Sequence, residues 1–188
     1  MPARDRRDRR EFVLHRASTA STASTSSASS PLPRQTLLEA LTTACLSGDA
    51  PAVESVLQHA TAADKGYALA AAAEQGSTDL VEWLVAAGAD LNFQDDAGRT
   101  PLMKAMFNGH RHIMELLLEF GAGLEPADAG NHTALTHAVR NGALDLVQLL
   151  LDRHANVEHQ VRQGRYPLRI AVRKGNSDIV AMLLQHNA

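Results

Sequence analysis

The 188-residue chain has little cysteine, few aromatic residues and no long apolar run. A single cysteine, Cys45, excludes an internal disulfide framework and predicts a reducing compartment, so we expect a cytoplasmic protein. No apolar run reaches the roughly 18 residues that span a bilayer, and no apolar segment near Met1 resembles a secretory signal. Aromatics make up only 4% of the residues, so the core must consist of Leu, Ala, Val and Ile.

Charge is present but unevenly distributed. The formal net charge of -3 favours neither nucleic acid nor a membrane surface as a partner. Residues 1–34 hold seven basic and three acidic side chains, residues 35–98 hold one and ten, and residues 99–188 hold ten and eight. The chain therefore changes from basic to acidic to mixed along its length.

Residues 1–34 have the composition of a disordered tail. The segment from Ser18 to Ser30 contains only Ser, Thr and Ala, which cannot bury enough surface to offset the entropy of ordering. Its Arg and Ser content is also compatible with an organelle transit peptide, although Asp5, Asp8 and Glu11 lie where such peptides avoid acids. The Arg-rich run would also be compatible with nuclear import.

Residues 35–188 repeat with a period of 33. Two independent series show this period: Gly76, Gly109, Gly142 and Gly175, and Ala89, Ala122, Ala155 and Ala188. Such a period is typical of a helical repeat array, in which each unit buries its apolar face against its neighbours.

The segment from Asp95 to Ala122 shows what one unit contains. Gly98 suits a tight turn, Thr100 can cap a helix, and Pro101 suits the first helical position. Gly109 should end this helix, and a second apolar-striped helix follows. The unit is therefore a turn and two short antiparallel helices.

Gly98-Arg99-Thr100-Pro101-Leu102, with Gly109-His110 and Gly121-Ala122, resembles an ankyrin repeat. The resemblance implies an all-α solenoid of helix-turn-helix units with β-turn fingers. We expect five units, at 35–62 (degenerate, with an abbreviated turn), 63–94, 95–127, 128–160 and 161–188. Asn131 replaces the turn glycine of the fourth unit and should adopt the left-handed conformation that Asn tolerates.

No group of residues in the sequence has the pattern of a catalytic, cofactor or metal site. The nine histidines, including His132 and His137, match no zinc spacing, and we expect no metal ligand among them. Cys45 is expected to pack in a helix, and Asp95-Asp96 is expected to be a solvated turn. We therefore predict a protein that is not an enzyme and needs no cofactor.

The resemblance implies that a partner protein binds a concave surface made of turn tips and the exposed side of each first helix. Phe107 is the one exposed aromatic candidate there and is expected to be the anchor, with basic side chains that select an acidic partner. The predicted partner-binding residues are Asp96, Arg99, Lys104, Phe107, Asn108, His132, His137, Arg140, Asn141, Arg162, Arg165, Arg169, Arg173 and Lys174.

An alternative function is a scaffold or targeting adaptor. In that case the array is a spacer, and either the tail or the C-terminal end, where an apolar last helix could support self-association, carries the function. Nucleic-acid binding is not expected, because it would rest on the basic strip from Arg162 to Lys174 alone.

Overall fold

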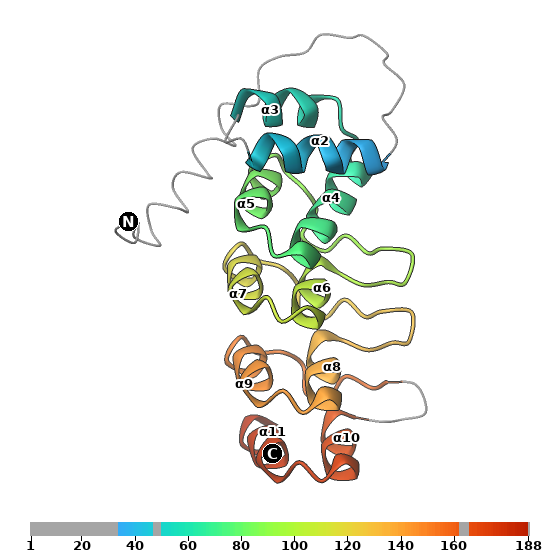
Figure 1. Ribbon diagram of the computed structural model, residues 1–188. Coiled ribbons are helices and arrows are strands. Elements are labelled where there is room, and N and C mark those ends of the chain that lie inside the picture. The colour runs from blue at the N-terminus through green and yellow to red at the C-terminus, as the bar shows by residue number, and fades with distance from the viewer. Residues whose placement is uncertain (1–33, 47–49, 162–165, 188) are drawn as a thin grey trace, which may run out of the picture.

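The computed structural model describes residues 34–46, 50–161 and 166–187, in which the chain forms ten helices (Figure 1). They stack as five antiparallel pairs, as an all-α solenoid requires. Their bounds are α2 (Arg34–Leu46), α3 (Ala50–Gln58), α4 (Ala62–Gln75), α5 (Thr78–Ala86), α6 (Pro101–Phe107), α7 (Arg111–Glu119), α8 (Ala134–Asn141), α9 (Leu144–Asp152), α10 (Pro167–Lys174) and α11 (Ser177–Asn187). We call α4, α6, α8 and α10 the A helices, and α5, α7, α9 and α11 the B helices.

Local sequence signals set the helix ends as predicted. The Thr100 hydroxyl accepts the backbone N–H of Met103, and Pro101 occupies the first turn of α6. Thr133 caps α8 in the same way, by accepting the N–H of Thr136. Left-handed glycines, among them Gly142, follow the last residues of α4, α8 and α10.

Side chains at 33-residue intervals build the core. Ala72, Ala105, Ala138 and Ala171 in the A helices are all fully buried, and so small a side chain lets neighbouring helices approach closely. Leu84, Leu117, Leu150 and Leu183 fill the matching position of the B helices and are at most 3% exposed. Burying each such Leu contributes about 2 kcal/mol, which is how stacking stabilises units that could not fold alone.

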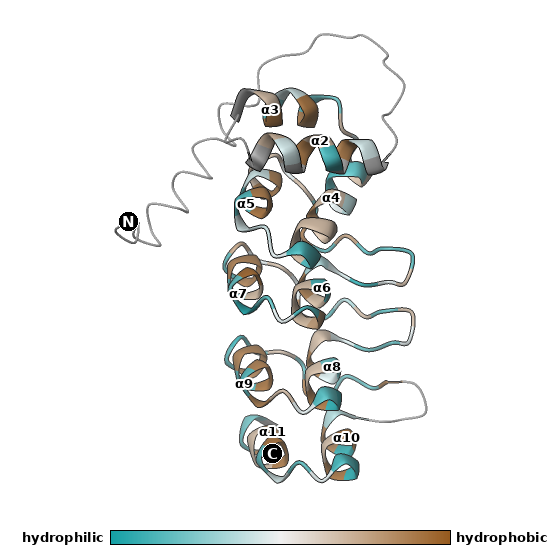
Figure 2. Ribbon diagram, viewed as in Figure 1, coloured by the Kyte–Doolittle hydropathy of each residue, from teal (hydrophilic) through white to brown (hydrophobic). Residues whose placement is uncertain are grey.

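The connections from α5 to α6 and from α7 to α8 are long fingers that project to one side of the A helices (Figure 1). The Asp95 N–H donates to the Arg99 carbonyl, and the Ala129 N–H of the next finger donates to the Ala97 carbonyl at 3.0 Å. Only residues 59–61 separate α3 from α4. Figure 2 shows that the fingers are mostly hydrophilic, whereas most of the apolar stretches lie within the helices.

The turn of each finger needs a left-handed residue. Gly98 has φ 73°, and Asn131, at the equivalent position, has φ 63°, as predicted for this substitution. None of the helices in the described ranges is both long enough and apolar enough to cross a bilayer.

Candidate functional site

The predicted binding residues fall into columns that run along the array. Glu74, Phe107, Arg140 and Arg173 are spaced by 33 and lie near the C-terminal ends of α4, α6, α8 and α10. The next residue in each unit forms a second polar column, which includes Asn108, Asn141 and Lys174. Arg162 and Arg165 lie outside the described residues.

In the third unit, Asp95 holds two of the predicted cations. Its Oδ2 lies 3.0 Å from a terminal guanidinium nitrogen of Arg99 and 3.4 Å from Nζ of Lys104. Lys104 also reaches Glu74 of the preceding A helix at 2.7 Å. The expectation that Asp95 is solvated is wrong: its side chain is 10% exposed, because the carboxylate lies over α6 and also accepts the N–H groups of Ala97 and Arg99.

Asp96, by contrast, is exposed at the tip of this finger and accepts a hydrogen bond from the Tyr67 hydroxyl at 2.9 Å. Asn108 is exposed as well, and its side-chain amide donates to the Lys104 carbonyl. Arg99 and Lys104 are already paired with Asp95 and Glu74 within the fold. A partner would have to compete with these internal contacts.

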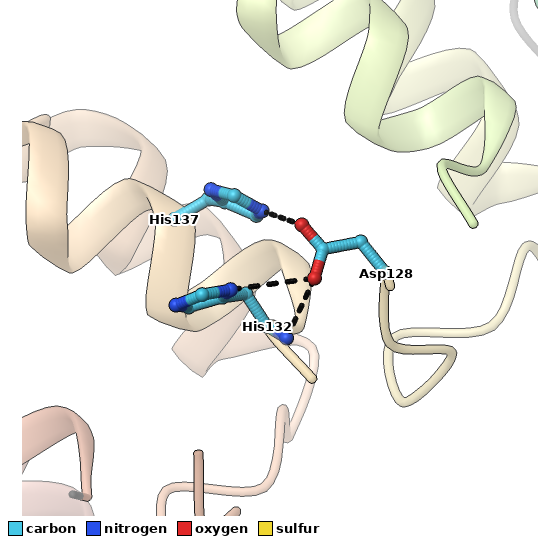
Figure 3. A group of neighbouring side chains, drawn as sticks. All are labelled: Asp128, His132 and His137. Atoms are coloured by element: carbon cyan, nitrogen blue, oxygen red, sulfur yellow. Dashed lines mark hydrogen bonds and ion pairs between the residues drawn. The ribbon is translucent and has the colours of Figure 1, made fainter. Parts of the chain in front are cut away.

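In the fourth unit, Asp128 occupies the position of Asp95, and histidines occupy the positions of Arg99 and Lys104 (Figure 3). Asp128 Oδ2 lies 2.7 Å from Nε2 of His137, and Oδ1 lies 3.3 Å from Nδ1 of His132. The expectation that His137 is an exposed surface residue is wrong: it is 3% exposed, because its ring lies between Asp128, Phe107 and the body of α8.

Arg140, one turn further along α8, determines the tautomer of His137. Its guanidinium donates to Nδ1 of His137 at 2.9 Å, since arginine has no acceptor. Nδ1 therefore accepts, and Nε2 carries the proton that is donated to Asp128. The imidazole is neutral in this arrangement.

The electrostatics of the pair agree with these hydrogen bonds. Burial is the largest cause that lowers the pKa of His137, and the Arg140 charge adds to it, although Asp128 opposes both. Burial raises the pKa of Asp128, but the backbone N–H of His132, the His137 ring and the N–H of Gly130 together outweigh it and hold the pKa below its ordinary value. At neutral pH the pair is thus a carboxylate and a neutral imidazole.

Phe107 is exposed, as predicted, with 40% of its surface accessible. Its ring meets that of His137 edge to face, with centroids 4.8 Å apart and an interplanar angle of 87°. Tyr166, at the start of α10, is a second exposed aromatic side chain, with 38% of its surface accessible. That residue was missed because its position, equivalent to Thr100, is a buried cap in the third unit.

The basic residues of α8 and α10 differ from those of the third unit. Arg140, Arg169, Arg173 and Lys174 are exposed, and none forms an ion pair with another residue that the structure describes. Asn141 is exposed beside them. The structure thus leaves Arg173 and Lys174 in the two columns, and Arg169 earlier in α10, without an ion pair among the described residues, whereas Arg140 donates to Nδ1 of His137.

Comparison with known proteins identifies the architecture. A family model described as ankyrin repeats (3 copies) matches residues 69–161 and 126–188. No curated protein matches the chain. The two matched segments together span well over half of the sequence. They include all four members of the column formed by Glu74, Phe107, Arg140 and Arg173. On the repeat spacing, the stacked helix pairs and this match, the chain belongs to the ankyrin-repeat family.

Proposed function

We propose that this chain is a non-catalytic binding module that recognises an acidic segment of a partner protein along the fingers and A helices. Ankyrin repeats are in general modules for protein–protein interaction, and the family is typically non-catalytic. The observation that carries the proposal is the column of exposed side chains formed by Phe107, Arg140 and Arg173. An aromatic residue beside arginines is the composition found at the energetic centre of protein interfaces.

The internal ion pairs indicate which basic side chains a partner could pair with. Arg99 and Lys104 are held by Asp95 and Glu74, so a partner gains little by replacing those contacts. Arg140, Arg169, Arg173 and Lys174 form no ion pair with a described residue, although Arg140 donates a hydrogen bond to the neutral ring of His137, and they are concentrated in α8 and α10. We therefore place the acidic part of the partner opposite these two helices and an apolar side chain against Phe107.

A charge-reversal comparison tests the proposal. Phe107→Ala combined with Arg173→Glu should reduce the affinity for the captured partner at least tenfold, or about 1.4 kcal/mol, because it removes the anchor and repels an acidic segment. Arg153→Glu, an exposed residue directly after α9, makes the same charge change outside the two columns and serves as the control. Proteins captured from cell extract by the wild type would be identified and their affinities measured by calorimetry.

Two results would contradict the proposal. One is an identical set of captured proteins for the wild type, the double variant and Arg153→Glu. The other is loss of capture only when residues 1–34 are deleted, which would favour the adaptor alternative, in which the array is a spacer. Circular dichroism of each variant would show that the fold is retained.

A further inference from the structure

The fourth unit places three metal-ligating side chains together. Ligand atoms of Asp128, His132 and His137 all lie within 4.8 Å of one another, and Figure 3 shows both imidazoles directed at the two carboxylate oxygens. Asp128 belongs to the finger and His137 to α8, so the group joins two elements. The side chains of Asp128 and His132 are 14% and 23% exposed, which leaves a route from solvent.

The third unit shows that the carboxylate position belongs to the repeat itself. In both units, Oδ1 of the aspartate accepts two backbone N–H groups, from the second and the fourth residue after it, at 2.8–2.9 Å. Oδ2 is left for side chains. In the third unit it meets Arg99 and Lys104, which cannot bind a cation, whereas in the fourth unit the same two positions hold imidazoles.

We propose that Asp128, His132 and His137 form a binding site for a divalent transition-metal ion of the zinc class. Two imidazole nitrogens and one carboxylate oxygen are a ligand set that Zn²⁺ accepts, and three protein ligands leave a fourth position open. Ligand atoms about 2.0–2.2 Å from a tetrahedral zinc ion are about 3.3 Å apart. Asp128 Oδ2 lies 2.7 Å from Nε2 of His137, and Asp128 Oδ1 lies 3.3 Å from Nδ1 of His132. The three ligand atoms all lie within 4.8 Å of one another, so side-chain rotation would bring one carboxylate oxygen and both nitrogens to that spacing.

Arg140 opposes this site in the metal-free protein. It donates to Nδ1 of His137, which keeps the proton on Nε2, the nitrogen that faces Asp128. A metal ion that binds Nε2 displaces this proton to Nδ1 or to solvent, and a protonated Nδ1 needs an acceptor instead of a guanidinium. Arg140 is exposed and must turn away for binding. Replacing it by Gln would supply an amide oxygen that can accept from Nδ1 and would remove a positive charge.

Zinc titration of the full-length, chelator-treated and untagged chain tests the site. Isothermal calorimetry with Zn²⁺, and the visible spectrum with Co²⁺, would measure affinity and coordination. We expect one ion per chain with a dissociation constant below about 0.1 mM. His132→Gln and His137→Gln should each weaken zinc binding at least tenfold. Arg140→Gln should tighten it about tenfold, as expected for a change in a residue that hydrogen-bonds to a metal ligand.

His112→Gln, an exposed histidine in α7, is the matched control and should bind as the wild type does. Asp128→Asn keeps the side-chain oxygen that accepts the backbone N–H groups. It should weaken zinc binding, and it tests the site even if His137→Gln does not fold. Zinc binding weaker than about 0.1 mM would overturn the proposal. So would binding that His132→Gln and Asp128→Asn leave unchanged, or that His112→Gln reduces equally. None of these measurements depends on the partner protein, so failure here leaves the proposed function intact.

Discussion

Nζ of Lys104 lies 2.7 Å from the Glu74 carboxylate of the preceding unit and 3.4 Å from that of Asp95 in its own finger. One ammonium therefore joins two A helices and a turn. Its own side chain is 14% exposed, whereas that of Glu74 is 51% exposed. The pair is a link between units rather than a feature of one helix.

Lys104→Met should lower the free energy of unfolding by about 0.5–1 kcal/mol, because it keeps the apolar stem and removes both ion pairs. The loss should shrink between about 0.1 M and 1 M salt, since the Glu74 side of the network is screened. Urea denaturation at the two salt concentrations would measure it. Arg111→Met, which breaks the exposed pair between Arg111 and Glu115 within α7, should cost less. Equal costs for the two variants would show that the link between units contributes no more than an exposed pair within one helix.

Asp95→Asn should destabilise the protein at neutral pH but not in acid. Burial raises the pKa of Asp95, but hydrogen bonds from the Arg99 backbone, the Arg99 guanidinium and the Ala97 N–H outweigh it and lower the pKa. A folded-state pKa below the unfolded one means that the carboxylate stabilises the fold above the ordinary pKa. That stabilisation disappears as the pH falls through the folded-state value.

Urea denaturation across a pH series would test this dependence. The wild type should be more stable than Asp95→Asn by roughly 1 kcal/mol at neutral pH, and the two should converge as the medium becomes acidic. Asp96→Asn removes the same charge from the exposed neighbour and should cost less. A constant gap between the wild type and Asp95→Asn at every pH would contradict the assignment of a stabilising carboxylate.

Gly98→Ala should cost more than Gly109→Ala, although both glycines have φ 73°. A Cβ on Gly98 would lie 2.7 Å from the Ala129 nitrogen and 3.0 Å from Asp128, whereas a Cβ on Gly109 meets nothing within 4 Å. The left-handed conformation alone costs a non-glycine residue roughly 1–2 kcal/mol, so Gly109→Ala should lower the free energy of unfolding by about that much. Gly98→Ala should lose about 1 kcal/mol more, since the fingers must separate. Thermal denaturation would compare the stabilities of the two variants. Equal losses would show that the neighbouring finger moves away from the added methyl group at no cost in free energy.

The fold was accessible from the sequence because each unit carries its own signals. Thr100, Pro101 and the glycines at 33-residue spacing set helix ends through local backbone chemistry, and the structure places them as expected. The apolar stripes set which faces stack, and the family match agrees. Exposure of Phe107 also followed from its phase in the repeat.

Side-chain partners could not be predicted in the same way. The spacing of the histidines alone predicts no metal ligand, and it does not show that Asp128, from the turn, lies against His132 and His137. A signal was present: Asp95, Arg99 and Lys104 recur 33 residues later as Asp128, His132 and His137. These three positions form one contact group only because the aspartate turns back over the A helix, and the sequence does not show that turn.

The sequence by itself determined the repeat, its helix ends, its left-handed turns and the identity of its apolar faces, because these depend on neighbouring residues and on periodicity. Only the tertiary structure decided that the Asp95 side chain is largely covered and His137 buried, that Lys104 is committed to Glu74 and Asp95, and that Arg140 holds a neutral imidazole. Those outcomes depend on how a finger lies across its own helix and against the next unit. Such distances are set by packing between units rather than by position along the chain.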